Sequence, residues 1–284
     1  MTQSLSQRLK LDLRSDEALD QLQAQARYYF QAAEFAELTG RAPRSPSLGM
    51  ALHRLAKRGR IVAVTRRPAG YLIVPPEHAS FGAPPFTWWI DDCLKPIEPL
   101  YYVALLSAAQ HWGSAHYARQ DVQVMISRAH LPLTPGRLKI TFVAKSNLAG
   151  TPTVTVRTGV APWRVSTRAA TALDLLRHQD WVGGLEPVAR ILNNLGSAIE
   201  AKELHDALDA LDQVTTAQRL GFLLERLKHK ALADLVSKWL GSRANARAPQ
   251  SLELGTSLPS NLKTDLRWRV VFDPRRLSHA LEIR

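Results

Sequence analysis

The residues with the clearest chemical potential are cations gathered in one segment of the sequence. Eight lysine or arginine residues and no acidic residue lie between Glu37 and Glu77. Cationic side chains without acidic neighbours can bind phosphate oxygens, so this segment is suited to contact a polyanion such as duplex DNA. Two alternatives stay open at this point, namely a solvated basic surface and a surface that binds another protein.

A helix is predicted to position about half of these cations. Ser45 can cap its start, Pro46 suits its first turn, and Gly59 ends it. An apolar stripe at helical spacing marks its inner face. The opposite face carries small residues near the start and cations towards the end, as in a helix that enters the major groove. The candidate DNA-binding residues of this segment are Arg41, Arg44, Ser45, Ser47, Met50, His53, Arg54, Lys57, Arg58, Arg66 and Arg67.

The neighbouring elements predict a winged helix-turn-helix domain over residues 1–76. Residues 15–27 predict a helix, and residues 28–40 predict a short β-prone entry followed by a second helix. Residues 60–64 and 71–75 are rich in β-branched and aromatic residues and predict a hairpin. Arg66 and Arg67 lie at its tip, where the wing of such a domain rests on the DNA backbone.

Residues 77–88 are rich in proline and predict a linker, and residues 89–284 predict a larger α+β domain with a small β-sheet and a helical bundle. Its predicted elements are a helix over about 100–112, strands over 121–127, 137–144 and 153–159, and helices for about 75 residues from Ser166. A polar loop over 243–262 and a strand over 266–273, which could return to the sheet, complete the prediction.

Residue patterns that would support catalysis or metal binding are missing. His111 and His116 are five positions apart, which is a poor spacing for two ligands on one helix face. Asp121 and Gln123 stand where a nucleotidyltransferase would need two carboxylates, and an amide cannot supply the second anionic metal ligand. We therefore expect no enzyme activity, no catalytic residues, no metal site and no cofactor.

Composition sets the broad class of the protein. The chain has 284 residues, a formal net charge of +12 and a pI near 10.2, which favours nucleic acid or an anionic surface as a partner. Cys93 is the single cysteine, so an intramolecular disulfide cannot form and the cytoplasm is the expected compartment. Neither a signal peptide nor an apolar run long enough for a membrane span is visible, so no membrane association is expected.

The sequence resembles the AbiEi-type antitoxins of bacterial type IV toxin-antitoxin systems. In the predicted winged helix the resemblance lies in residues 44–61 and 70–78. In the second domain it lies in residues 101–116, 142–147, 165–178, 183–192 and 218–227. Its most specific positions are Thr171, Asp174, Leu175, Gly183, Gly184, Leu185, Gln218, Arg219, Leu220 and Gly221.

This resemblance implies a DNA-binding antitoxin with a role in phage defence. Its winged helix would repress its own operon by binding inverted repeats in double-stranded operator DNA through two protomers that act cooperatively. The expected state is a monomer in solution or a dimer on DNA, and the sequence leaves the oligomeric state away from DNA open. Its C-terminal domain would counteract a nucleotidyltransferase toxin, through residues that the resemblance does not identify. Two other hypotheses remain, a stand-alone transcriptional regulator whose second domain senses a ligand or dimerises, and an enzyme acting on nucleotides or on the toxin.

Overall fold

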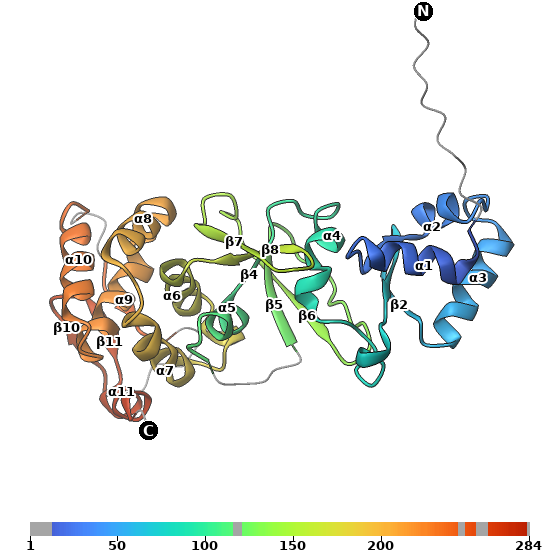
Figure 1. Ribbon diagram of the computed structural model, residues 1–284. Coiled ribbons are helices and arrows are strands. Elements are labelled where there is room, and N and C mark those ends of the chain that lie inside the picture. Colours follow the sequence, from blue (N-terminus) through green and yellow to red (C-terminus); the bar gives the residue numbers. More distant parts are fainter. Residues whose placement is uncertain (1–12, 116–120, 244–247, 254–260, 283–284) are drawn as a thin grey trace, which may run out of the picture. The chain divides into compact units, whose positions relative to one another are not determined.

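The structure is a computed structural model that describes residues 13–115, 121–243, 248–253 and 261–282 (Figure 1). The chain is mixed α+β, as predicted, and divides into two compact units. Unit 1 comprises Met1–Pro99, Leu131–Thr141 and Val156–Trp163. Unit 2 comprises Leu100–His130, Phe142–Thr155 and Arg164–Arg284.

Unit 1 begins with helices packed on a small sheet. Its elements are α1 (Ser15–Ala24), β1 (Tyr29–Gln31), α2 (Ala32–Leu38), α3 (Pro46–Lys57), β2 (Ile61–Arg66) and β3 (Ala69–Ile73). The strands pair antiparallel in the order β1-β3-β2. Leu19, Phe35 and Leu55 from the three helices are fully buried against Phe30 and Ile73 from the sheet. The predicted helices, the short strand and the hairpin are all present.

The start and the burial of α3 follow from its sequence. The Ser45 hydroxyl accepts a hydrogen bond from the Leu48 amide at 3.3 Å, which satisfies one of the free donors of the first turn. Pro46 occupies the first position, where the missing amide proton costs nothing. Four apolar residues at helical spacing are buried, namely Leu48, Ala51, Leu52 and Leu55. The opposite face of α3 therefore points away from this core.

The predicted linker region is structured and packs within unit 1. It contains the 3-10 helices η1 (Pro76–His78) and η2 (Phe86–Trp88), followed by α4 (Ile90–Leu94). The ring centroids of Trp88 and Tyr28 are 4.8 Å apart. Cys93 is fully buried, as expected of a small apolar residue, and burial raises the pKa of its thiol to about 12. The two compact units thus differ from the predicted domain boundaries, which remain predictions.

A five-stranded sheet has the order β6-β5-β4-β8-β7. Its strands are β4 (Tyr102–Val103), β5 (Asp121–Ile126), β6 (Lys139–Ala144), β7 (Thr153–Arg157) and β8 (Pro162–Ser166). The central strand β4 pairs antiparallel with β5 and parallel with β8. The prediction of a helix from about Leu100 was therefore wrong at its start, because α5 covers only Leu105–His111.

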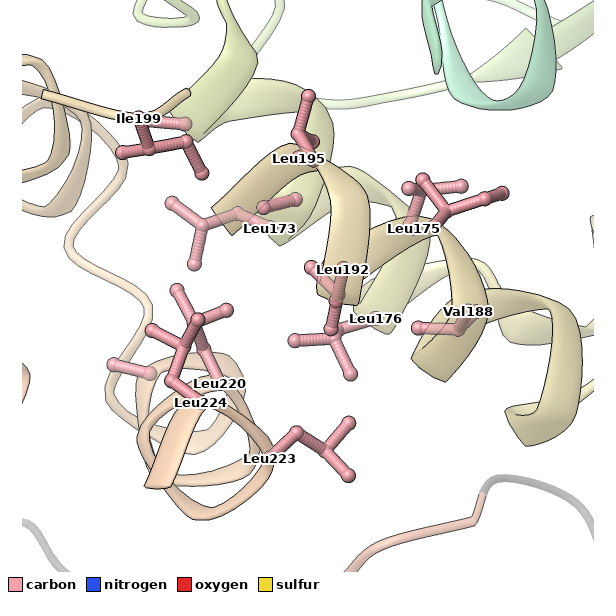
Figure 2. Close-up of a cluster of buried hydrophobic side chains, with 14 of the residues drawn as sticks. Leu173, Leu175, Leu176, Val188, Leu192, Leu195, Ile199, Leu220, Leu223 and Leu224 are labelled. Atoms are coloured by element: carbon pink, nitrogen blue, oxygen red, sulfur yellow. The ribbon is translucent and has the colours of Figure 1, made fainter. Parts of the chain in front are cut away.

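Five helices of unit 2 form the predicted bundle. They are α6 (Arg168–Arg177), α7 (Leu185–Gly196), α8 (Ala201–Leu211), α9 (Val214–Arg226) and α10 (Lys230–Gly241). Figure 2 shows leucines from α6, α7 and α9 converging on one apolar cluster. Each helix places Leu, Ala or Val at i, i+3 and i+4 on its buried side, which is the pattern that predicted it.

The C-terminal residues form a second small sheet with the order β10-β11-β9. Its strands are β9 (Gln250–Ser251), β10 (Lys263–Asp265) and β11 (Val270–Phe272), and helix α11 (Pro274–Leu281) follows. The last predicted strand therefore does not return to the five-stranded sheet. The predicted loop over 243–262 lies partly outside the described residues. Among the helices of the described ranges, none is long and apolar enough to cross a membrane.

Candidate nucleic-acid interface

The outward face of α3 carries the predicted contact residues of this helix. Ser47, Met50, His53, Arg54 and Lys57 are all exposed, and Met50 keeps 57% of its surface accessible. Their positions recur at intervals of three or four residues, so they share one side of the helix. The prediction that this side is opposite the apolar stripe is confirmed by the burial of the stripe.

The residues that precede α3 have different environments. Arg44 is exposed, whereas Arg41 is half-buried and its Nη1 has no hydrogen-bond partner among the described residues. Ser45 is half-buried, and its hydroxyl, which caps α3, lies 3.1 Å from the Ser47 hydroxyl. The role that the structure gives to Ser45 is therefore to position the helix.

Helix α1 brings two acidic residues to the end of α3. Asp16 lies 3.0 Å from the Arg58 guanidinium and 3.6 Å from that of Arg60, and Asp20 lies 3.3 Å from Arg60. The segment between Glu37 and Glu77 contains no acid, but the fold supplies these carboxylates from outside it. Both arginines remain partly exposed, so the ion pairs add little stability and can open.

The other cations of this surface have no such partner among the described residues. No ion pair joins Arg44, Arg54 or Lys57 to an acidic residue within the described ranges, and the same holds for Arg66 and Arg67. These five side chains are exposed. Their positive charge is therefore available to an anionic partner.

The hairpin tip that carries Arg66 and Arg67 is held by local contacts. The Thr65 hydroxyl donates a hydrogen bond to the carbonyl of residue 68 at 2.6 Å. A Cβ at Gly70 would lie 2.4 Å from the Tyr29 hydroxyl and 2.5 Å from the Thr65 hydroxyl oxygen. Any larger residue at this position would therefore displace the side chains of Tyr29 and Thr65, which pack over Gly70 in the sheet.

Unit 2 contains a buried polar cluster that sequence reasoning did not identify. The Lys145 ammonium donates hydrogen bonds to Asp174 Oδ1 at 2.6 Å and to the Tyr102 hydroxyl oxygen at 3.0 Å. The Tyr102 hydroxyl donates to Asp174 Oδ2 at 2.8 Å. The side chains of Lys145 and Asp174 are 1% exposed, and burial raises the pKa of Tyr102. The available signal was one acid in the otherwise apolar stretch of α6 and one lysine directly after β6.

The other distinctive residues of the family resemblance also have structural contacts. Gln218 donates hydrogen bonds to the carbonyls of Ala248 and Trp268 at 3.1 and 2.9 Å. Arg219 donates to the Ser251 carbonyl at 2.6 Å, and burial lowers its pKa. These side chains attach the C-terminal segments to α9. They are buried, so they identify no surface for a toxin.

Gln123, one of the residues considered for catalysis, has a structural role. The Gln123 side chain accepts a hydrogen bond from the Leu106 amide at 3.0 Å and donates one to the Trp181 carbonyl at 2.9 Å. His116 lies outside the described residues. Within the described ranges, no group of three or more His, Cys, Asp or Glu residues is arranged to hold a metal ion.

Together, these features define a mixed α+β protein with a basic helix face and hairpin tip in unit 1 and a helical bundle in unit 2. Residues 102–226 match the family model of the AbiEi antitoxin C-terminal domain. This stretch of the chain is therefore similar to the C-terminal domain of AbiEi antitoxins. This match confirms the resemblance to AbiEi-type antitoxins and supports an antitoxin role in a toxin-antitoxin system.

A solved structure has a similar fold over most of its length. The crystal structure of the RV2827C protein from Mycobacterium tuberculosis matches with a TM-score of 0.64, and the match covers 91% of each chain. The sequence identity is 15%, so this similarity concerns the fold alone. No curated protein matches the sequence.

Proposed function

We propose that this chain is a DNA-binding antitoxin of a type IV toxin-antitoxin system. Residues 1–76 form a winged helix-turn-helix domain that represses the chain's own operon, and the domain over residues 89–284 counteracts a nucleotidyltransferase toxin. The observation that carries the DNA-binding part is the set of exposed cations on α3 and the hairpin tip, which form no ion pair with an acidic residue in the part of the chain that the structure describes. The observation that carries the antitoxin part is the family match.

The arrangement of side chains on α3 supports a major-groove contact. Ser47, Met50 and His53 are exposed on one side of the helix, and Arg54 and Lys57 follow towards its end. Short and uncharged side chains near the start allow close approach to base edges, and the cations further along can bind phosphates. A hydrophobic protein partner would not require this charge.

The remaining candidate residues have flanking roles in this proposal. Arg66 and Arg67 at the hairpin tip contact the sugar-phosphate backbone or the minor groove, and Arg41 and Arg44 contact phosphates before α3. Arg58 contacts phosphate only after it leaves Asp16, which lies 3.0 Å away.

The assembly on DNA is also part of the proposal. The operator is double-stranded DNA with inverted repeats, and two protomers that are monomers in solution meet on it as a dimer. The protein acts in the cytoplasm, away from membranes, without enzyme activity, a cofactor or a metal of its own.

A gel shift of the full chain on the DNA upstream of its own coding sequence tests the DNA-binding proposal. We expect a discrete complex that resists excess competitor of shuffled sequence, with a second shifted band if two protomers bind. A protein that binds the upstream and shuffled DNA with equal affinity would contradict autorepression.

Co-expression with the adjacent gene tests the antitoxin proposal. If that gene encodes a nucleotidyltransferase toxin, the full chain should restore growth. The double variant Arg54→Glu/Lys57→Glu should lose repression of a reporter but keep the growth rescue, because both substitutions are confined to the exposed face of α3. Repression without rescue would favour a stand-alone transcriptional regulator.

A further inference from the structure

Met50 is an apolar side chain exposed on a basic surface. It lies on the outward face of α3 with 57% of its surface accessible, three and four positions before His53 and Arg54. Pro46, Gly49, His53 and Arg54 line a shallow hollow together with Met50. Burying this side chain in a complex would remove apolar surface from water, whereas the free chain gains nothing from exposing it.

The surroundings of Met50 favour a close approach of the helix to its partner. A Cβ added at Gly49 would have nothing within 4 Å, so the space beside Met50 is open. Ser47 on the same side is short and exposed. Met50 is therefore the long apolar side chain between small residues on one side and cations on the other.

This composition matches one chemical feature of a DNA groove. In the major groove the 5-methyl group of thymine is the one methyl group that the four bases present, beside their hydrogen-bond donors and acceptors. The exposed cations Arg54 and Lys57 complement the phosphates that border such a methyl group. Methionine is unbranched and polarisable, so it can adapt its side chain to a methyl group.

We propose that Met50 is a specificity-determining residue that contacts the 5-methyl group of a thymine in each operator half-site. This inference rests on the proposed DNA binding of α3. It predicts that one thymine in each half-site contributes through its methyl group, independently of its hydrogen-bonding groups.

The test removes that methyl group and nothing else. The full chain is titrated with the upstream duplex that it protects in footprinting, with each thymine replaced in turn by deoxyuridine. We expect one replacement per half-site to weaken binding by about threefold to tenfold, the amount typical of a buried methyl contact. The Met50→Ala variant should bind the thymine and deoxyuridine duplexes equally, and Met50→Leu should keep most of the discrimination.

The possible outcomes distinguish failure of the Met50 inference from failure of the proposed DNA binding. If the wild-type protein binds its upstream DNA but no deoxyuridine replacement weakens it, the Met50 inference is overturned and DNA binding stands. Discrimination that persists in Met50→Ala also overturns it, because another residue then reads the methyl group. If no DNA is bound and an acidic protein partner binds α3 instead, both proposals fail.

Discussion

At the scale of single residues, Arg54 in α3 and Arg58 directly after it differ in whether the fold supplies them with an acidic partner. Arg54 has no acidic partner within the described ranges, whereas Arg58 is held by Asp16 at 3.0 Å. Arg54→Ala and Lys57→Ala should each weaken operator binding by about 1 kcal/mol or more. Arg58→Ala should cost less, because the wild-type side chain must first leave its carboxylate. Fluorescence anisotropy at one salt concentration measures this order, and a larger loss for Arg58→Ala than for Arg54→Ala would contradict it.

Two helical glycines provide a second test at this scale. A Cβ at Gly221 in α9 would lie 1.9 Å from the ring of Trp268, which is fully buried. Gly221→Ala should therefore lower the free energy of unfolding by about 1 to 3 kcal/mol through overpacking. Gly49 in α3 has nothing within 4 Å of the same position, so Gly49→Ala should raise stability by about 0.5 to 1 kcal/mol.

Chemical denaturation of both glycine variants measures these free energies. The two substitutions are chemically identical, so the difference between them isolates the contact with Trp268. Equal effects at the two positions would show that the close approach at Gly221 relaxes without cost.

At the scale of elements, the buried pair Lys145–Asp174 joins α6 to the end of β6. Both side chains are 1% exposed, so removing one partner leaves an unpaired charge in the interior. Lys145→Met should destabilise the protein by about 3 to 5 kcal/mol, and adding Asp174→Asn should cost little more. A double-mutant cycle by thermal or chemical unfolding measures the coupling.

A surface pair on α8 is the matched control. Lys202 and Asp206 lie 2.6 Å apart and are 84% and 54% exposed. Lys202→Met should change stability by less than about 0.5 kcal/mol. If Lys145→Met and Lys202→Met lowered the free energy of unfolding by similar amounts, burial would not be the reason for the large effect predicted at Lys145.

Sequence periodicity predicted the helices and strands that bury one apolar face. It missed short elements, which carry too few apolar residues to form a pattern of their own. The helices from α6 to α10 carry Leu and Ala at helical spacing and were all expected. Strand β4 has two residues and continues directly into the apolar α5, so no local pattern separates the two. Similarly, α11 places only Leu277 and Ala280 in the core, which is too few for a clear signal.

In the candidate nucleic-acid interface, too, features that are local in sequence could be predicted and contacts between distant residues could not. The exposed face of α3 followed from the burial of its apolar stripe, which is local in sequence. The pairing of Arg58 with Asp16 joins residues 42 positions apart, and no window of sequence shows it. Proline content suggested a linker over 77–88, but Trp88 packs on Tyr28, a contact that depends on tertiary structure.

At the scale of the whole molecule, the half-buried His178 couples stability to pH. Nε2 of His178 is buried without a hydrogen-bond partner among the described residues. Burial, with the positive charges of Arg177 and Lys145, lowers its pKa, and Asp174 opposes this shift. The unfolded chain therefore binds a proton near the ordinary histidine pKa of about 6.5, while the folded chain does not.

It follows that the stabilising effect of neutral His178 is complete above about pH 6.5 and is lost as the pH falls towards the lowered pKa. The melting temperature should fall on acidification, and the His178→Gln variant should show a smaller fall. Burial also lowers the pKa of His111, so part of the dependence of melting temperature on pH should remain in the His178→Gln variant. His53→Gln, on the exposed face of α3, is the control, and an unchanged slope in His178→Gln would contradict the prediction.

The net charge of +12 belongs to the whole chain, so it does not by itself locate the DNA contact. Both units carry cations, and many of those in unit 2 are paired with acids, such as Arg226 with Asp265 at 3.0 Å. Point substitutions in the full chain are the suitable test, because unit 1 includes segments from beyond residue 99 and a truncation would remove them.

The most direct measurement is the salt dependence of operator binding by the wild-type chain and by Arg66→Ala/Arg67→Ala. If α3 and the hairpin tip bind phosphates, log affinity should fall linearly with log salt, with a slope of about −0.9 for each phosphate contacted. The double variant should have a shallower slope by about 1 to 2, and Lys202→Ala in unit 2 should leave the slope unchanged. A flat dependence in the wild type, or equal slopes in the wild type and the double variant, would contradict the proposal that this surface binds DNA.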